Sequence, residues 1–279
     1  MRLTPLLAVA ALSLASPALA HNHGSHAAGQ DGAAERANNL NDILLHPRRA
    51  EERARDRYRN PIETLEFFRV EPTMRVAEYS PGGGWYTRVL VPYLAPEGSY
   101  VAFQRGRLAA EDGTTWPQRW LAALAEGDMA GYGSPLAIES TAIPEDVAGT
   151  VDRVLVFRSL HGLLNNNVAD EELRAIRTLL ADDGMVGVVQ HRAPEDEAYA
   201  RANGSRGYLR QSDVIRLFEL NGFELVDSSE VNANPADTAD WEGGVWTLPP
   251  TLSQGEADRD RYLAIGESDR MTLLFRKRQ

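Results

Sequence analysis

Two histidines follow apolar runs in this sequence, and both stand where they could move a proton. His161 lies shortly after one run and His191 ends another, and each has an arginine beside it, Arg158 and Arg192. A histidine titrates near neutral pH and suits general-base catalysis, while a guanidinium group binds anions. We therefore expect either histidine to act as a base or to orient an acceptor, with the arginines binding an anionic substrate group. The alternative is a structural network of histidine, arginine and carboxylate side chains.

A glycine-rich turn in the segment 75–94 could hold a ligand. Glu78 ends a short apolar run, Gly82, Gly83 and Gly84 come next, and an amphipathic stretch follows. Glycine permits positive φ and a close approach of the backbone to a ligand. The first turn of the following helix leaves N–H groups free. This order of strand, turn and helix predicts a cleft at the carboxyl end of a strand, where open α/β sheets bind nucleotides.

Alternating strands and helices must position these residues. The predicted strands are the run 76–77 and the segments 100–104, 136–139, 151–157, 185–190, 223–226 and 271–275. The predicted helices are 47–58, a helix starting at Asn60-Pro61, 85–94, 116–124, 170–180, and one capped by Ser212 and ended by Asn221-Gly222. This alternation predicts an α/β fold with a doubly wound, Rossmann-like sheet of seven strands, mostly parallel, and helices on both faces.

A long polar insertion, 231–269, separates the last two predicted strands. A loop of this length inside a compact domain is usually functional. Its tryptophans, Trp241 and Trp246, could form a lid over an acceptor or anchor the loop to the domain. The charged segment 267–270 could cover the cleft or close the insertion through internal salt bridges, and the second interpretation is favoured because such clusters are commonly solvated pairs.

The composition limits the classes of protein to which this chain can belong. The chain has 279 residues, a formal net charge of −11 and no cysteine. Its length suits one decorated α/β domain or two small domains. The acidic balance argues against a sequence-independent nucleic-acid binder, because phosphate neutralisation requires a basic surface. Without cysteine, disulfides and cysteine-zinc sites are impossible.

The amino-terminal segment has the pattern of an export signal. A positive start, an apolar stretch and an Ala-x-Ala end make residues 1–20 a predicted secretory signal peptide. We expect a flexible, His-rich tail over 21–40, a single domain over 41–279, and a periplasmic or secreted protein that has no membrane segment after signal removal. Cleavage after Ala20 would leave His21 and His23 at the new terminus, which suits Cu(II) or Ni(II), although an unstructured polar tail is favoured.

The motif Glu78-x-Ser80-x-Gly82-x-Gly84 resembles the acidic-x-Gly-x-Gly-x-Gly loop of the class I S-adenosylmethionine-dependent methyltransferases. The resemblance covers roughly 61–277 and implies a last strand that runs antiparallel. It also implies S-adenosylmethionine as cofactor, bound by Glu78, Ser80, Gly82, Gly83, Gly84 and Gln104. Two residues depart from the family pattern. Ser80 replaces a glycine, which is tolerable if φ there is not positive, and Gln104 replaces the acidic residue that binds the ribose hydroxyls.

A narrower resemblance is to a family of predicted exported bacterial methyltransferases. It is carried by 57–61, 81–87, Phe157-Arg158-x-x-His161, 191–193, 229–235, 244–250 and 265–271. It implies the same fold and identifies no substrate.

Methyl transfer is an in-line displacement, which requires an aligned acceptor and sometimes a base. We expect His161 or His191 to be catalytic, and Arg158, Arg192, Glu230 and Asn232 to bind a small acceptor of unknown identity. The predicted export places the protein where S-adenosylmethionine is not made. The alternative is therefore a non-enzymatic periplasmic protein that binds a small ligand on this scaffold.

Overall fold

The computed structural model describes residues 39–106, 108–127 and 129–279. The predicted signal peptide and nearly all of the His-rich tail lie outside these residues. Residues 39–45 are helical and Leu40 is buried, so the folded domain includes the last two positions that were assigned to the tail. No helix in the described part of the chain is long and apolar enough to cross a membrane.

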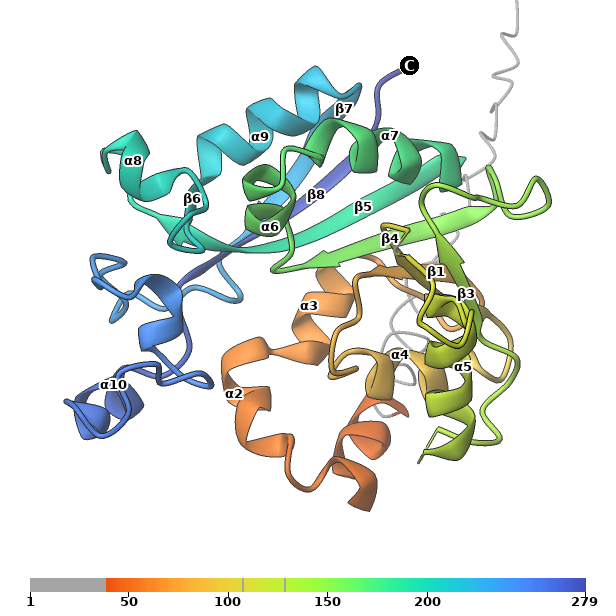
Figure 1. The fold of residues 1–279 in the computed structure, drawn as a ribbon, viewed down its shortest axis with the longest axis horizontal. Helices are drawn as coiled ribbons and strands as arrows, with labels where there is room; N and C mark the ends of the chain where they lie inside the picture. Colours follow the sequence, from red (N-terminus) through yellow and green to blue (C-terminus); the bar gives the residue numbers. More distant parts are fainter. Residues whose placement is uncertain (1–38, 107, 128) are drawn as a thin grey trace, which may run out of the picture. The chain divides into compact units, whose positions relative to one another are not determined.

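Seven strands form the main sheet, in the order β3-β2-β1-β4-β5-β8-β7 (Figure 1). They are β1 Arg75–Tyr79, β2 Ser99–Gln104, β3 Leu136–Glu139, β4 Val151–Phe157, β5 Leu180–Ala193, β7 Phe223–Ser229 and β8 Arg270–Lys277. A two-residue strand, β6 Leu209–Arg210, pairs with the end of β5. β8 runs antiparallel to both of its neighbours, and the remaining pairs of the main sheet are parallel. The predicted fold class is confirmed.

Helices cover both faces of the sheet (Figure 1). One face carries α3 Pro61–Phe67, α4 Thr87–Leu94 and α5 Trp116–Glu126, and the other carries α6 Leu160–Asn165, α7 Ala169–Leu179 and α9 Gln211–Leu220. Alternate strand residues point to opposite faces. Val154 and Val156 therefore join the core beneath α6, α7 and α9, while Leu155 joins the core beneath α3 and α4. The strands are apolar on both faces because both faces are buried.

The segment 47–58 differs from the single helix that was predicted. It forms two 3-10 turns, Pro47–Arg49 and Arg53–Arg55, followed by the short helix α2 Asp56–Arg59. The cause is visible in Arg49, which is fully buried, makes a two-point ion pair with Asp56 and lies over the Trp85 ring. These contacts bend the segment inward, whereas a regular helix would direct its charged residues to water.

Two other local predictions differ from the structure. β5 begins at Leu180 and continues through 182–184, which were predicted as a turn, with a register shift against β4. The N-cap of α9 is Arg210, and Ser212 lies within the helix, where its hydroxyl and backbone N–H contact Glu195. Both differences arise from pairing with distant segments.

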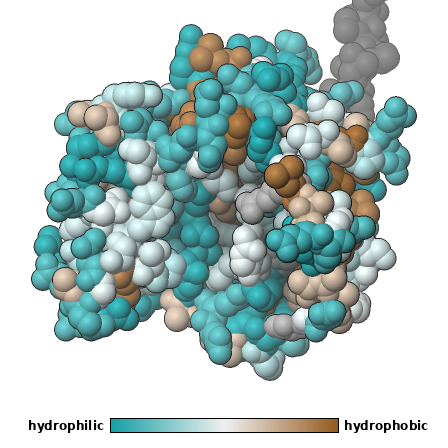
Figure 2. All heavy atoms as spheres, in the orientation of Figure 1, coloured by the Kyte–Doolittle hydropathy of each residue, from teal (hydrophilic) through white to brown (hydrophobic). Residues whose placement is uncertain are grey.

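The insertion between β7 and β8 contains a 3-10 turn, Gly244–Thr247, and α10 Arg259–Ile265. It has its own small core, in which Trp241, Val245 and Leu248 pack with Ala202 and Tyr208 near α8 Tyr199–Ala202. The insertion is therefore a packed part of the domain. Figure 2 shows that the viewed face of the molecule is mostly hydrophilic, with its apolar side chains in small patches.

Candidate functional site

The site lies at the carboxyl ends of β1, β2, β4 and β5. Ser80 directly follows β1 and Arg158 directly follows β4, and both adopt a left-handed backbone, with φ of 53° and 56°. Such conformations cost non-glycine residues about 1–3 kcal/mol and cluster at functional sites. Ser80 thus occupies a position with positive φ, which is the condition under which the missing family glycine matters.

Three adjoining cavities open at this rim, and Ser80 and Arg158 line all three. The first, named the Gln104 cavity, has a volume of about 610 Å³. The second, the Glu78 cavity, has about 370 Å³ and includes the glycine turn and Arg59. The third, the His191 cavity, has about 280 Å³. They adjoin one another in one cleft, and the two larger cavities each have a volume within the range of about 300–1,000 Å³ that small-molecule sites usually have.

Gln104 ends β2 and lines the first cavity. Its side chain is buried, and its amide nitrogen Nε2 has no hydrogen-bond partner among the described residues. A buried donor without a partner costs free energy and usually marks a missing water, ion or ligand. The Gln104 cavity therefore presents a donor suited to a ligand hydroxyl or another acceptor atom.

Glu78 is the acidic residue of the second cavity. It is only 3% exposed, and its Oε2 accepts hydrogen bonds from Thr87 Oγ1 at 2.8 Å and Tyr100 Oη at 2.6 Å. Burial raises its pKa to about 7, although both hydrogen bonds and the cations Arg158 and Arg59 oppose this rise. A carboxyl group held at such a cost to stability is typical of a functional site.

The glycine turn provides room beside Glu78. Gly82 and Gly84 have positive φ, which explains glycine at these positions. Gly83 does not have positive φ, and a Cβ added there would meet nothing within 4 Å. Gly83 is exposed and lines the Glu78 cavity as well as a neighbouring cavity beside α5, so a side chain at this position would project into open space at the edge of the cleft.

His161 and His191 meet in the third cavity, as their strand positions predicted, with ring centroids 5.8 Å apart. Burial lowers the pKa of His161, and burial with nearby Arg158 lowers the pKa of His191 well below its ordinary value. Both rings are therefore neutral at pH 7. Trp246 lies edge-on to His161 at 6.0 Å and forms part of the cavity wall.

Hydrogen bonds to the two rings differ. Gln190 Nε2 donates to the Gly207 carbonyl at 2.9 Å, which fixes the orientation of the amide, and it lies 3.4 Å from His161 Nδ1. His161 Nδ1 is then an acceptor, and its proton lies on Nε2. His191 Nδ1 lies 2.6 Å from Ser268 Oγ, which can accept a hydrogen bond from Nδ1–H; in that tautomer Nε2 has a free lone pair.

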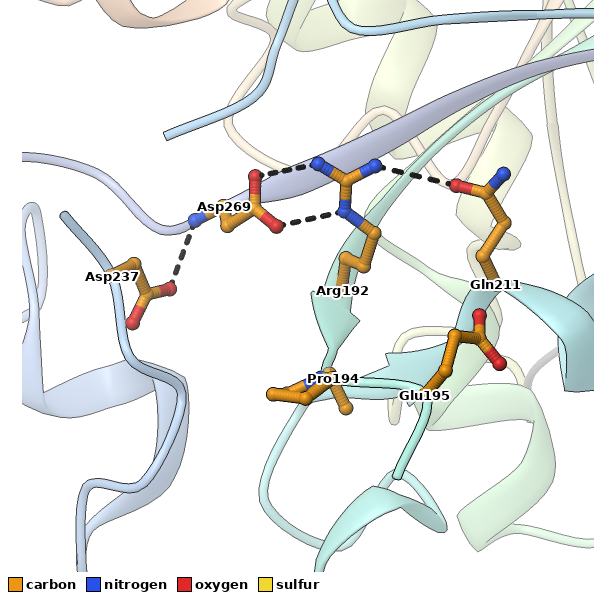
Figure 3. Close-up of a pocket in the computed structure, with 7 residues that line it drawn as sticks. Arg192, Pro194, Glu195, Gln211, Asp237 and Asp269 are labelled. Atoms are coloured by element: carbon orange, nitrogen blue, oxygen red, sulfur yellow. Dashed lines mark hydrogen bonds and ion pairs between the residues drawn. The ribbon is translucent and has the colours of Figure 1, made fainter. Parts of the chain in front are cut away.

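Arg192 lies at a different cavity, of about 370 Å³ (Figure 3). Its guanidinium group makes two bonds to Asp269, at 2.8 and 3.1 Å, and two to Glu230, at 2.8 and 2.7 Å. Figure 3 shows Arg192 between Asp269 and Gln211, with Asp237 behind Asp269. Arg192 and Glu230 thus belong to an ion-pair network outside the three cavities of the cleft, and substrate binding by either residue stays a prediction.

Asn232 is also placed away from the cleft. It is buried, and its Nδ2 donates to Thr64 Oγ1 at 2.9 Å and to Thr272 Oγ1 at 3.0 Å, which connects α3 to β8. Asn232 lines none of the three cavities of the cleft, and the substrate contact expected of it stays a prediction. Trp241 is an anchor whose Nε1 donates to Asp237 at 2.7 Å, whereas Trp246 lines the cleft. The predicted role of anchor thus fits Trp241, and the position of Trp246 fits the predicted role of lid.

No family model and no curated protein sequence matches this chain. Solved structures do resemble it. The 4+2 cyclase SpnF has a TM-score of 0.54 at 14% identity, covering 89% of this chain and 95% of its own. The didemethyltoxoflavin N1-methyltransferase of Burkholderia thailandensis, solved with S-adenosylhomocysteine, has a TM-score of 0.49 at 15% identity over 95% of each chain. An S-adenosylmethionine-dependent methyltransferase from Aquifex aeolicus has 0.47 at 16% identity, over 70% of this chain and 93% of its own.

The resemblance to SpnF and the order of the strands support the doubly wound, Rossmann-like fold with an antiparallel last strand. At these identities the comparisons show the fold alone.

Sequence reasoning did not find the contribution of Arg55 and Arg59, which line the Glu78 cavity. The density of arginine in 47–59 was visible, but nothing local indicated that the segment folds back over the sheet edge. It also did not pair these arginines with Glu267, which lies more than 200 residues away along the chain.

Proposed function

We propose that this protein binds S-adenosylmethionine in the cleft and transfers its methyl group to a small acceptor. The observation that carries the proposal is the buried amide of Gln104, a donor without a partner at the end of β2. The family resemblance expects the ribose hydroxyls at this position. A hydroxyl oxygen would satisfy Gln104 Nε2 and remove the cost of its burial.

The remaining residues fit the same ligand. Gly83 leaves open space beside the glycine turn, and Glu78 offers a buried carboxyl group to the cationic end of an amino-acid moiety. Binding of a cation there would return the pKa of Glu78 toward its ordinary range, because an adjacent positive charge stabilises the carboxylate.

When bound, S-adenosylmethionine supplies a methyl group activated by a sulfonium. His191 is the residue that we assign as base, since Ser268 leaves its Nε2 free to take a proton from an acceptor hydroxyl or amine. His161 carries its proton on Nε2 and orients the acceptor as a donor, with Gln190 as the positioning residue. Nitrogen-15 NMR of the two rings tests this division. Protonated Nε2 in His161 and unprotonated Nε2 in His191 are expected, and the reverse pattern would refute it.

We further propose that the protein works outside the cytoplasm, in the periplasm or as a secreted protein. The support is the sequence of residues 1–20, with its positive start, apolar stretch and Ala-x-Ala end. Detection of the full-length, uncleaved chain in the cytoplasm of its native host would contradict this.

The test of donor binding uses the glycine turn. Calorimetric titration with S-adenosylhomocysteine should show saturable binding to the full chain. Gly83→Leu should abolish it while the melting temperature stays near wild type, because φ there is ordinary and a Cβ meets no neighbour. Gly83→Ala is the matched control and should retain most of the affinity.

If neither S-adenosylmethionine nor S-adenosylhomocysteine binds at millimolar concentration, the methyltransferase proposal fails. The non-enzymatic ligand-binding protein would then be the better interpretation. The similarity to a cyclase fits the principle that one scaffold hosts several functions.

A further inference from the structure

Four arginines share one buried carboxylate beside the cleft. Glu267 accepts from Arg55 Nε at 2.6 Å, Arg59 Nε at 3.3 Å and Arg270 Nη2 at 2.8 Å. Arg158 interacts electrostatically with the same group. Burial opposes ionisation of Glu267, but the guanidinium groups of Arg270, Arg59 and Arg55 overcome this and lower its pKa to about 2. The cluster therefore has one firmly ionised carboxylate and an excess of positive charge.

The nearest other carboxyl groups do not offset this excess. Glu52 accepts from Arg88 at 2.8 Å, and Asp56 is engaged by Arg49. Burial raises the pKa of Glu78 to about 7, so Glu78 carries only part of a charge at neutral pH. Glu52 also interacts electrostatically with Arg59 and Arg55, but it is shared with Arg88 and Arg49. In the described part of the chain, the surrounding carboxyl groups thus offset the positive charge of the cluster only in part.

Several N–H groups of the cluster also lack partners. Arg59 is 1% exposed, and its Nη1 and Nη2 and Arg55 Nη2 are buried without a hydrogen-bond acceptor. The guanidinium group of Arg158 has no hydrogen bond or ion pair with any of residues 39–106, 108–127 and 129–279. Burial and the neighbouring arginines lower the pKa of Arg59 to about 10 and of Arg158 to about 9. The buried, unpaired N–H groups of Arg59 and Arg55 and the unpaired guanidinium group of the partly buried Arg158 together favour an anionic ligand.

The unpartnered groups face the cleft. Arg55 and Arg59 line the Glu78 cavity, and Arg158 stands where that cavity meets the His191 cavity. With its ammonium group at Glu78, the proposed methyl donor has its one carboxylate in the same cavity, where it can meet Arg55 or Arg59. Arg158 also lines the His191 cavity, so it is the arginine that stays available to an anionic group of the acceptor.

The His191 cavity limits what that acceptor can be. Its volume is about 280 Å³, and its wall is mixed: polar groups such as Arg158, His161, His191 and Glu267 stand beside the apolar groups of Phe157, Val245, Trp246 and Pro249. A small organic anion with an apolar body can use both parts of this lining, whereas a bare inorganic ion would use only the polar part. We propose that the acceptor is a small carboxylic acid whose carboxylate binds Arg158 and whose body lies against Trp246; this inference rests on the proposed function.

The experiment compares acids with their neutral amides. Calorimetric titrations of the full chain, with and without S-adenosylhomocysteine, use acetate against acetamide and benzoate against benzamide, at matched ionic strength. At least one acid should bind tenfold or more tightly than its amide. Arg158→Gly should weaken that acid about 10- to 100-fold, the range expected for a charged hydrogen bond. Glycine suits the left-handed φ of this position, so the variant should fold.

Two further variants serve as controls. Arg158→Lys retains the charge and should bind the acid better than Arg158→Gly, although without the two-point geometry. Arg216→Gln removes an exposed arginine on α9 and should bind as wild type. Circular dichroism melts of all variants establish that they are folded.

The outcomes separate the two proposals. If S-adenosylhomocysteine binds and neither acid is preferred over its amide, the carboxylic-acid inference is overturned while the donor site stands. An acid preference that survives Arg158→Gly would also overturn it. If an acid binds through Arg158 but S-adenosylhomocysteine does not bind, the anion site is supported and the methyltransferase proposal fails.

Discussion

Replacing Glu78 with Gln should stabilise the protein at alkaline pH while it weakens donor binding. Glu78 is buried beneath the glycine turn, and burial raises its pKa from 4.5 to about 7. Glutamine has nearly the same shape, and its carbonyl oxygen can accept the hydrogen bonds from Thr87 and Tyr100. The substitution therefore removes a charge from a buried site and keeps the contacts.

The sign and size follow from linkage. Folded Glu78 keeps its proton until about pH 7, whereas the unfolded chain releases it near pH 4.5. Between these values the native state binds more protons, so stability falls as the pH rises. At about 1.4 kcal/mol for each pH unit, the free energy of unfolding of the wild type falls by about 3 kcal/mol across this window. The free energy of unfolding of Glu78→Gln should equal that of the wild type near pH 4.5 and exceed it by about 3 kcal/mol at pH 8.

Urea unfolding at pH 4.5, 6 and 8 measures this difference. Glu66→Gln, at an exposed position of α3, controls for the loss of one negative charge. The same proteins are titrated with S-adenosylhomocysteine, and we expect Glu78→Gln to bind it at least tenfold more weakly, because a charged hydrogen bond is lost.

Two results would refute the reasoning. Equal stability differences at pH 4.5 and 8 would show that the charge of Glu78 is not costly in the folded state. A stabilised variant with unchanged affinity for S-adenosylhomocysteine would show that this cost is unrelated to ligand binding.

Substitutions at three other positions test the site. Ser80→Gly should stabilise the protein by about 1 kcal/mol by relieving positive φ, and Ser80→Val should destabilise it by more, as urea midpoints would show. Glu267→Gln should cost about 3–5 kcal/mol at pH 7, because it leaves buried arginines uncompensated; since its folded pKa is about 2, the wild-type contribution should disappear as the pH falls from 4.5 toward 2. The pKa of His191 lies well below 6.5 in the folded protein, so on acidification the unfolded chain binds this proton first and the wild type loses stability. Between pH 7.5 and 5.5, the free energy of unfolding of His191→Gln should therefore fall by about 1 kcal/mol less than that of the wild type. Equal losses in variant and wild type would contradict this last expectation.

Much of the fold is readable from local patterns. Apolar runs such as 151–157 predict buried strands, and their alternation with amphipathic helices predicts the layered sheet. The glycine turn after Glu78 predicts the cleft for a local reason, since the need for positive φ is a property of single residues. His161 and His191 could be placed together because the carboxyl ends of parallel strands meet at one edge of a sheet.

The partners of charged side chains were not readable in this way. In the sequence, Arg158 and Arg192 each stand just beyond an apolar run that predicts a strand, so they look alike. The structure pairs Arg192 with Asp269 and Glu230, whereas the guanidinium group of Arg158, in the cleft, makes no hydrogen bond or ion pair with the described residues.

The sequence by itself thus determined the sheet, the glycine turn and the edge at which chemistry can occur. Only the tertiary structure decided which cations at that edge remain available to a ligand. The physical reason is that backbone conformation and burial depend mainly on residues close in sequence, whereas the compensation of a charge depends on every group within a few ångströms. For Arg55 and Arg59, the compensating group is Glu267 at the far end of the chain.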